Sequence, residues 1–456
     1  MKRYDSYVHV DSPWFYSIPG EWKQTRLKSL TTYISRGQTP SYTDDETCPK
    51  VINQALFSRG FWNKEKIRYT ASESINNANI AKVGDVLLAS TGGGVLGKVF
   101  CFDQPDLYIA DSHVTIIRTR EQLSGRYLYY YLSVRYDAIN ALLSKGSTNQ
   151  TELQEFPLKN MPVPVPPRNE QDQIVRYLDW QVSKINRLIA AKRKQIELLS
   201  EEKQNIINAA VLHGVNDRCE KRTSPILFAD WIPSHWRVLR GKYLFAEHDR
   251  RTETGNEVLL SVSHITGVTP RSEKNITMFQ AESLVGYKIC SVDDIAANTM
   301  WMWQGAIAVS DYYGVISPSY NTYHQIGNHY NRKYLDYLLR SNVMVNEYKA
   351  KSTGIRKSRL RLYPEQFLSM SFPIPPMDEQ LEIVKYIEAK IQRIEVMVST
   401  IHAEIQKIQD LRARLISDVV TGQIDVRGIE VPTFEYIDES NNNDENTEEM
   451  EAELDG

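Results

Sequence analysis

PPRNEQ at residues 166–171 and PPMDEQ at residues 375–380 decide how this chain of 456 residues is organised. Each hexapeptide opens about forty residues of helical pattern, and the two patterns end at Gly214 and Gly422. The paired prolines block helix upstream, because proline lacks the amide donor and restrains the residue before it. The Asn or Asp at the fourth position suits a helix N-cap, and glycine commonly follows a helix. The same signals therefore predict a long helix at two places in the chain.

Apolar residues recur every seven positions in both segments, which is the pattern of a coiled coil. Three cations, Lys192, Lys203 and Arg412, also stand at seam positions. Two unrelated core helices are the alternative, but they would not need matching registers behind matching hexapeptides. We expect the helices to be about 65 Å long and to pack antiparallel as a rigid spacer. The positions expected to serve helix packing or contact with partners are Glu170, Gln171, Ile185, Glu379, Gln380 and Ile394.

The repeat also includes the segments that precede each helix. Three pairs of short motifs share the same order and a similar spacing. They are IPGEW and IPSHW at residues 18–22 and 232–236, GDVL and DDIA at 84–87 and 293–296, and YLYYYL and YLDYLL at 127–132 and 334–339. RGQTP (36–40) and TGGG (91–94) have no partner in the second block, and WMWQ (301–304) has none in the first. A shared frame with different loops indicates two related modules that read different ligands.

These signals predict an α+β fold, in which two pseudo-repeated mixed α/β domains are separated by two long antiparallel helices. Strands are expected at residues 82–90, 98–102, 258–262 and 306–309, and helices at 127–143 and 333–349. From Glu430 onward we expect disorder, because few apolar residues remain. The expected boundaries are an N-terminal arm at 1–12, a first domain at 13–168, a spacer helix at 169–215, a linker at 216–227, a second domain at 228–377, a second spacer helix at 378–422 and an acidic tail at 423–456.

Charge is distributed unevenly, although the formal net charge is only −3. Residues 423–456 hold twelve acidic residues and one basic residue. Residues 13–168 carry 18 Lys and Arg against 14 Asp and Glu, and residues 228–377 carry 17 against 13. The positive excess of both blocks favours a polyanionic partner, although many proteins reach an excess of this size.

The cysteines and the apolar segments indicate which classes of protein can be excluded. The four cysteines form no Cys-x-x-Cys pair, so neither a zinc site nor a disulfide framework is predicted. No apolar leader follows Met1, and no stretch approaches 18 continuous apolar residues. We therefore expect a cytoplasmic protein without a membrane span.

One glycine-rich segment partly matches the phosphate-binding loop of nucleotide-binding enzymes. GGGVLGK at residues 92–98 has the spacing of a phosphate-binding loop, but Val99 stands where Ser or Thr should hold magnesium. The residues that follow alternate like a strand, so a glycine hairpin tip is preferred over a nucleotide site. EEK at residues 201–203 resembles half of a nuclease site, yet it lies in a long helix where solvated charges are ordinary. We predict no catalytic or metal site, and a P-loop enzyme stays as an alternative.

Several polar loops carry groups suited to DNA. Guanidinium and amide groups can bond guanine and adenine edges, and clustered cations suit phosphates. The densest cluster has four cations within residues 356–361. The alternative for each position is an ordinary exposed polar loop. The residues predicted to bind DNA are Ser35, Arg36, Gln38, Thr39, Gly93, Lys98, Ser147, Asn149, Gln150, Arg250, Arg251, Arg356, Lys357, Arg359 and Arg361.

The whole layout resembles the specificity subunit of type I restriction-modification systems. The resemblance rests on the two hexapeptides with their helices, the two Ile-Pro…Trp motifs, GQTP at residues 37–40, GDVL at 84–87 and GSTNQ at 146–150, and it spans about residues 13–427. The second block departs from this pattern, because GIR at residues 354–356 lacks the glutamine found at Gln150.

This resemblance implies a subunit without a catalytic centre. Two target-recognition domains would each read one half of a split double-stranded DNA sequence, and the paired helices would fix the gap between the halves. The implied partners are two methylation subunits, which bind S-adenosylmethionine, and restriction/translocase subunits. No cofactor is expected in this chain. A coiled-coil scaffold that binds only protein partners is the alternative.

Overall fold

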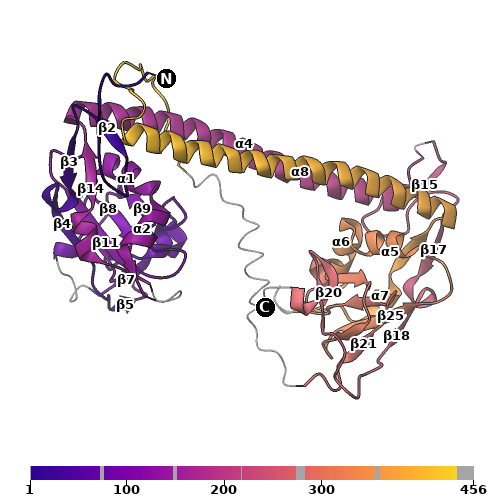
Figure 1. The fold of residues 1–456 in the computed structure, drawn as a ribbon. Helices are drawn as coiled ribbons and strands as arrows, with labels where there is room; N and C mark the ends of the chain where they lie inside the picture. Colours follow the sequence, from indigo (N-terminus) through magenta and orange to yellow (C-terminus); the bar gives the residue numbers. More distant parts are fainter. Residues whose placement is uncertain are drawn as a thin grey trace. The chain divides into compact units, whose positions relative to one another are not determined.

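The computed structural model describes residues 2–71, 77–146, 151–216, 218–273, 283–354 and 360–438. The chain forms two compact units, which we call unit 1 (residues 1–194 and 402–443) and unit 2 (residues 195–401 and 444–456). Each unit contains one β-rich module and one half of each of two long helices, α4 (Arg168–His213) and α8 (Met377–Val420) (Figure 1).

The proline and glycine signals of α4 and α8 act where expected, but Asn169 and Asp378, predicted as N-caps, are the second residues of the helices. The Pro167 carbonyl accepts the amides of Glu170 and Gln171 in the first turn of α4. Gly214 and Gly422 follow the last turns with φ of +73° and +71°, a conformation that glycine adopts without strain. Both helices match their predicted bounds to within two residues.

The two helices pack antiparallel within each unit. In unit 1, Asn186 Oδ1 accepts from Arg412 Nη1 at 2.9 Å, and Lys192 Nζ lies 2.6 Å from Glu404 Oε2. In unit 2, Lys203 Nζ lies 2.9 Å from Glu395 Oε1. Residue numbers fall along α8 as they rise along α4, which confirms the predicted antiparallel packing.

The three cations at seam positions are the residues that make these contacts. Lys192, Lys203 and Arg412 each find an acceptor on the opposite helix, so every one of these breaks in the apolar seam is paired. Polar pairs of this kind specify register in coiled coils. The buried apolar seam positions nearest to them are Ile189, Ile394, Ile401 and Ile405.

The module of unit 1 is built on two four-stranded sheets. The first sheet is antiparallel, in the order β4 (Thr31–Arg36), β11 (Val114–Thr119), β8 (Val86–Ala89) and β9 (Val99–Cys101). The second runs in the order β10 (Tyr108–Ala110), β6 (Lys50–Ile52), β7 (Arg68–Thr70) and β5 (Tyr42–Thr43). The helix α1 (Gly125–Ser133) packs on β8 and β9 and is followed by α2 (Tyr136–Leu143).

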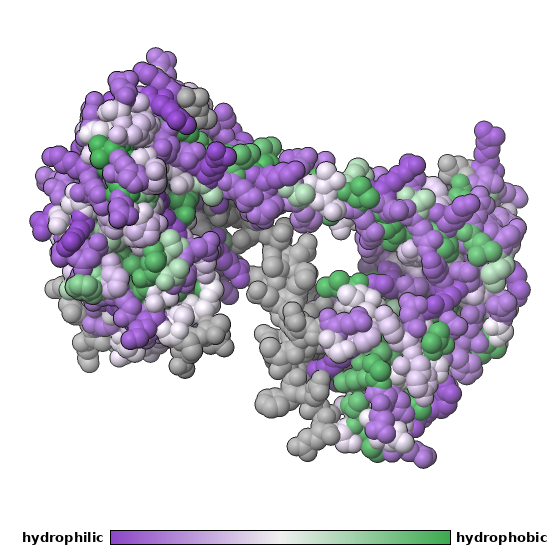
Figure 2. All heavy atoms as spheres, viewed as in Figure 1, coloured by the Kyte–Doolittle hydropathy of each residue, from purple (hydrophilic) through white to green (hydrophobic). Residues whose placement is uncertain are grey.

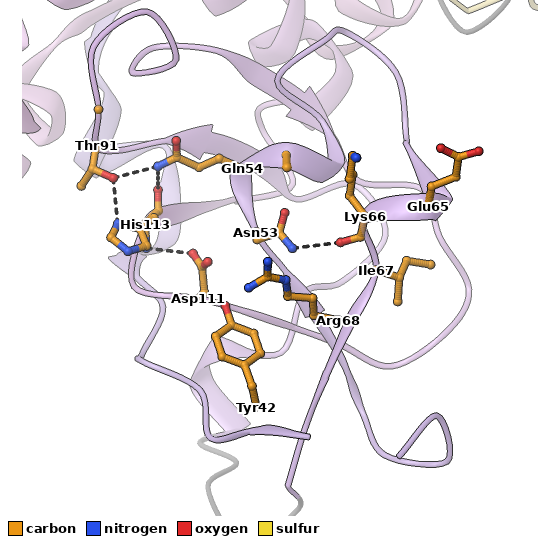
Figure 3. Close-up of a pocket in the computed structure, with 12 residues that line it drawn as sticks. Tyr42, Asn53, Gln54, Glu65, Lys66, Ile67, Arg68, Thr91, Asp111 and His113 are labelled. Atoms are coloured by element: carbon orange, nitrogen blue, oxygen red, sulfur yellow. Dashed lines mark hydrogen bonds between the residues drawn. The ribbon is translucent and has the colours of Figure 1, made fainter. Parts of the chain in front are cut away.

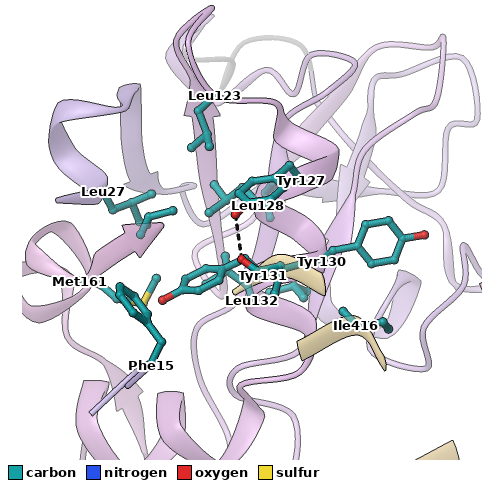
Figure 4. Packing of buried hydrophobic residues seen from close by; sticks show 14 of the residues in the cluster. Phe15, Leu27, Leu123, Tyr127, Leu128, Tyr130, Tyr131, Leu132, Met161 and Ile416 are labelled. Atoms are coloured by element: carbon teal, nitrogen blue, oxygen red, sulfur yellow. Dashed lines mark hydrogen bonds between the residues drawn. The ribbon is translucent and has the colours of Figure 1, made fainter. Parts of the chain in front are cut away.

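The core of unit 1 joins its module to the long helices. Tyr127, Tyr130 and Tyr131 of α1 are buried in one cluster with Ile416 of α8 (Figure 4). Tyr127 Oη lies 2.9 Å from the carbonyl oxygens of Pro164 and Val420 and shares its hydrogen between them. The tyrosine-rich motif at residues 127–132 therefore belongs largely to the core.

The module of unit 2 repeats the first sheet. Its order is β18 (Phe245–His248), β25 (Asn321–Gln325), β22 (Ile295–Ala297) and β23 (Ile307–Val309), and all pairs are antiparallel. The helices α5 (Arg332–Leu339) and α6 (Asn342–Lys351) follow it, as α1 and α2 follow the first. The repeat seen in the sequence is therefore a repeat of the fold.

Smaller pairs and short helices complete both units. The paired strands are β3 (Lys23–Arg26) with β14 (Pro162–Val165), β12 (Ser144–Lys145) with β13 (Glu152–Leu153), β17 (Arg237–Arg240) with β26 (Ser371–Ile374), β19 (Leu260–Ser263) with β20 (Gly267–Pro270), and β21 (Lys288–Cys290) with β24 (Gly314–Ile316). The short helices are α3 (Glu155–Asn160) and α7 (Pro364–Ser369).

Each of the single helices predicted at 127–143 and 333–349 is broken into two. In unit 1, α1 ends at Ser133, and the buried Arg135 guanidinium donates to the Tyr131 carbonyl instead of facing solvent. In unit 2, the Ser341 hydroxyl accepts the Met344 amide and starts α6 as its N-cap. A serine that caps a new helix cannot be told from helix interior by apolar spacing alone.

The arm at residues 1–12 and the linker at 216–227 are more ordered than predicted. The arm contributes β1 (Tyr7–His9), which pairs with β2 (Ser17–Pro19). The linker contributes β15 (Lys221–Thr223), which pairs with β16 (Trp231–Pro233). These three-residue strands are too short to show a periodic pattern, and their partners lie outside the arm and the linker.

The prediction that the tail is disordered from Glu430 is wrong as far as Asp438. The Ile437 amide donates to Ser183 Oγ, and its carbonyl accepts from Asn186 Nδ2, both at 3.0 Å. The Tyr436 ring lies 4.9 Å from the Arg126 guanidinium carbon. A few contacts with α4 and α1 thus hold a segment whose composition alone predicts disorder. Residues 439–456 lie outside the described part of the chain.

Within the described ranges, no helix combines the length and the apolar character needed to cross a bilayer. Hydrophilic side chains cover most of the visible surface of each unit, with scattered apolar ones (Figure 2).

Candidate nucleic-acid interface

The repeated hexapeptides fasten each long helix to its own module. Glu170 Oε1 accepts hydrogen bonds from Tyr4 Oη at 2.5 Å and from Trp22 Nε1 at 3.1 Å. In unit 2, Glu379 Oε2 accepts from Trp236 Nε1 at 3.0 Å and lies 2.9 Å from an imidazole nitrogen of His235. The Ile-Pro…Trp motif and the hexapeptide therefore occur together because the tryptophan of one binds the glutamate of the other.

The glutamine of each hexapeptide holds the first helix of its module. Gln171 Nε2 donates to the carbonyls of Pro166 and Gln122, and its Oε1 accepts the amide of Ser124, the N-cap of α1. Gln380 makes the same three contacts with Pro375, His329 and Asn331, the last being the N-cap of α5. Both glutamines are fully buried.

The packing positions predicted on the helices thus have internal contacts. Glu170, Gln171 and Gln380 are buried within the chain, Ile394 is buried in the seam, and Ile185 is half-buried. No contact with another chain is shown for any of them, so their role toward partners stays a prediction.

Five of the predicted DNA-binding residues meet at one end of the first sheet of unit 1. Ser35 and Arg36 end β4, and Gln38 and Thr39 follow it. Gly93 lies in the hairpin turn between β8 and β9, at the same end. This end of the sheet is the candidate interface of the module of unit 1, which we call module 1.

Internal contacts fix two of these side chains. Arg36 Nη2 donates to the Leu153 carbonyl at 2.7 Å, and Nη1 lies 3.5 Å from Glu152. Gln38 Oε1 accepts from Asn79 Nδ2 at 3.2 Å. The donors of Arg36 and the amide oxygen of Gln38 are therefore partly used inside the module.

The glycine tip between β8 and β9 is a hairpin turn rather than a nucleotide loop. Gly92, Gly94 and Gly97 have φ of +89°, +82° and +93°, which a side chain would strain. The turn leads into β9 and not into a helix, so its amides lack the arrangement of a phosphate-binding helix N-terminus. Lys98 lies over the Tyr136 ring at 4.5 Å.

A polar hollow of about 630 Å³ opens beside this tip (Figure 3). Gln54 Nε2 donates to Thr91 Oγ1 at 2.8 Å and to the His113 carbonyl at 2.9 Å, and Thr91 Oγ1 lies 2.8 Å from His113 Nδ1. Three separate segments of the chain are thereby locked together at its rim. The polar residues that line it are Tyr42, Asn53, Gln54, Glu65, Lys66, Arg68, Thr91, Asp111 and His113.

The electrostatics of the hollow are mixed. Burial raises the pKa of Asp111, although the His113 amide and the Arg68 guanidinium act in the opposite direction. Burial also raises the pKa of Tyr42, against the effect of Arg68. Two cations, Lys66 and Arg68, and two carboxyl groups, Glu65 and Asp111, therefore line the hollow together.

In unit 2, the corresponding end of the sheet carries the predicted arginines. Arg250 Nη2 donates to Ser291 Oγ at 3.1 Å, and Arg251 lies 3.0 Å from Asp249. Thr353 and Arg361 bridge each other through their backbones, as Ser144–Lys145 and Glu152–Leu153 pair in unit 1. The segments that flank the two polar loops predicted from the sequence therefore pair at equivalent places in the two modules.

Six predicted DNA-binding residues fall outside the described part of the chain. They are Ser147, Asn149, Gln150, Arg356, Lys357 and Arg359.

The hairpin turn of unit 2 shows a correspondence that the sequence concealed. Gly305, with φ of +97°, follows the β22–β23 turn at the place of Gly97. Trp301 and Trp303, whose rings lie 6.2 Å apart at 20°, therefore stand where unit 1 has Gly93 and Val95. The signal that could have aligned the two turns is the glycine two residues before the second strand in both.

Sequence reasoning missed the hollow altogether. Tyr42, Gln54, Lys66, Arg68 and His113 come from separate segments, and no local motif marks any of them. In the described ranges, no group of three or more His, Cys, Asp or Glu side chains is placed to hold a metal ion.

Comparison with known proteins agrees with this architecture. The family model described as "Type I restriction modification DNA specificity domain" matches residues 19–198. The chain is 22% identical over 441 residues to the putative type I restriction enzyme MjaX specificity subunit of Methanocaldococcus jannaschii, and this match covers 90% of the chain and 95% of the relative. It is also 22% identical over 433 residues to the MjaVIII specificity subunit of the same organism, with the same coverage.

A solved structure shares the fold. It belongs to work on complex assembly and conformational transition of a type I restriction-modification system. The TM-score is 0.61 at 15% identity, and the match covers 90% of this chain and all of the other. Two β-rich modules, two long packed helices and similarity along nearly the whole chain lead to one conclusion: the chain belongs to the family of DNA specificity subunits of type I restriction-modification systems, whose members are the non-catalytic part of the enzyme complex.

Proposed function

We propose that this chain reads a double-stranded DNA target in two halves, one with each module, and that α4 and α8 set the gap between the halves. The observation that carries this proposal is the pairing of the helices. Each helix is fastened to a module by the glutamate and the buried glutamine of its hexapeptide, and the opposite helix packs against it through the same seam. Two tethered readers become selective only when both engage at the matching spacing.

The difference between the modules supports separate specificities. Their sheets have the same strand order, but one hairpin turn is rich in glycine and the other contains Trp301 and Trp303. Arg250 and Arg251 have no counterpart at the end of β4 except Arg36. A common frame with different side chains at its polar end is expected of readers of two sequences.

The partners follow from the family. We expect two methylation subunits to dock on the long helices, and restriction/translocase subunits to join them. Exposed apolar residues on the helices support docking there: Leu198 is 52% exposed, Val396 61% and Leu411 63%. S-adenosylmethionine would be bound by the methylation subunits, where adenine is modified. We expect the complex to be cytoplasmic.

The test is to assemble the chain with its methylation subunits and map modified adenines on a randomised DNA library. The expected result is one motif of two short halves separated by a fixed number of unspecified base pairs. As a matched pair, Arg250→Ala with Arg251→Ala should weaken selection of one half only, and Arg36→Ala should affect the other. A single continuous motif, or binding of the partners without selection of DNA, would favour the scaffold.

A further inference from the structure

Arg68 is placed in the hollow of unit 1 so that its guanidinium faces the open space (Figure 3). It stands at the start of β7, and its guanidinium carbon lies 5.3 Å from the centre of the Tyr42 ring. Stacking on the ring fixes the plane of the guanidinium. Among the described residues, no carboxylate lies within ion-pair distance of Arg68, although Asp111 lines the same hollow.

Other arginines of the module are used differently. Arg118 binds both carboxylate oxygens of Asp85 at 2.9 and 2.7 Å. Arg126 donates twice to Asp179, and the Arg135 guanidinium is buried against backbone carbonyls. These side chains build the module, whereas Arg68 contacts Tyr42 and lines the hollow.

The wall around Arg68 is braced by two neighbouring amides. Asn53 Nδ2 donates to the Lys66 carbonyl at 3.1 Å, which holds the segment just before β7. Gln54 Nε2 bonds Thr91 and His113, which holds the hairpin tip and the turn before β11. Both donors of the Gln54 amide are therefore consumed internally, so Gln54 is a positioning residue rather than a reader.

A volume of about 630 Å³ lies within the range of sites that accept a ligand group of the size of a base. A planar guanidinium that presents parallel donors matches the O6 and N7 acceptors of guanine in the major groove. Lys66 is exposed at the rim, where it suits a neighbouring phosphate. Charged side chains also line the hollow, namely Glu65, Lys66, Arg68 and Asp111.

We propose that this hollow receives one guanine edge of the DNA half-site read by module 1, and that Arg68 determines the preference for guanine there. The proposal rests on the proposed function, since it names a specificity residue for that same recognition. Gln54 and Asn53 set the position of the hollow's walls, and Lys66 contributes attraction to the backbone without choosing a base.

The test compares Arg68→Ala, Arg68→Lys and the control Lys64→Ala in the complex assembled with its methylation subunits. Lys64 is an exposed cation four residues before Arg68 that does not line the hollow. Modified sites are mapped on a randomised library at fixed salt, and melting temperatures confirm that the variants fold. Both Arg68 variants should lose about 5- to 150-fold of the preference for guanine at one position of one half-site. The lysine should keep overall affinity, and Lys64→Ala should keep the whole motif.

Gln54→Ala should relax the same position, and it should add nothing to that position when combined with Arg68→Ala. An equal loss of affinity for all sequences would make Arg68 a phosphate contact and overturn the proposal. An unchanged motif in both Arg68 variants would also overturn it. If the unaltered chain selects no split motif at all, the proposed function itself fails, so the two failures are distinguishable.

Discussion

Replacing Glu170 by alanine tests how the repeated hexapeptides hold the fold. The carboxylate is 5% exposed, and its two donors, Tyr4 and Trp22, are 7% and 5% exposed. The substitution leaves a phenol hydroxyl and an indole N–H buried without an acceptor, at about 1–3 kcal/mol each. Loss of a negative charge at the start of α4 adds about 0.3–1 kcal/mol. We therefore expect unit 1 to lose about 2–7 kcal/mol of stability.

The assay must resolve the two units, because a chain with two units need not unfold in a single step. Hydrogen exchange followed by mass spectrometry does so. Glu170→Ala should speed exchange around β1, β2 and the first turns of α4. Glu379→Ala is the matched control and should act around β16 and the start of α8, because Glu379 binds Trp236. A change below about 0.5 kcal/mol, or faster exchange only in the other unit, would refute this reasoning.

Three further predictions concern titration, the tail and the phosphates. Burial raises the pKa of Glu347 to about 7, so the stability tied to this group is full below its ordinary pKa of 4.5 and is lost as pH rises through 7. Glu347→Gln should therefore stabilise the protein against urea by about 1–2 kcal/mol at pH 8, after allowance for solvent screening, and by nearly nothing at pH 4.5. An equal gain at both pH values would contradict this expectation. Asn186→Ala removes the donor to the Ile437 carbonyl and the acceptor of Arg412. The substitution should speed proteolysis at residues 430–438 and lower the free energy of unfolding by about 1–3 kcal/mol. An unchanged cleavage rate would show that other contacts hold the tail. If Arg356 and Arg359 contact phosphates, replacing both by alanine should reduce the slope of log affinity against log salt by about 1.8, and an identical slope would exclude those contacts.

The long helices could be predicted because their signals are local and repeated. Proline before the first turn, glycine after the last and an apolar residue at each seam position act within a few residues of one another. The heptad pattern alone could not explain why three of its apolar positions are occupied by cations. Lys192, Lys203 and Arg412 weaken an apolar pattern, and only the opposite helix shows that each has a partner.

The remaining differences come from contacts between distant segments. Strands of three residues at Tyr7–His9 and Lys221–Thr223 carry no periodic signal, and they form because β2 and β16 lie ready to pair with them. The hollow around Arg68 assembles from the second sheet, the hairpin tip and the turn before β11. The predicted residues at the end of β4 lie near it, so sequence located the region but not the side chains that line it.

The central claim is that α4 and α8 measure the distance between two readings of DNA. Removing residues 195–201 of α4 and 396–402 of α8 together takes out one heptad from each helix and keeps Lys192 opposite Glu404 and Lys203 opposite Glu395. Seven residues span about 10.5 Å of helix, which corresponds to about three base pairs. Mapping of modified adenines with this variant should recover the same two half-sites with the gap shortened by about three base pairs. Half-sites retained at an unchanged gap would contradict the account.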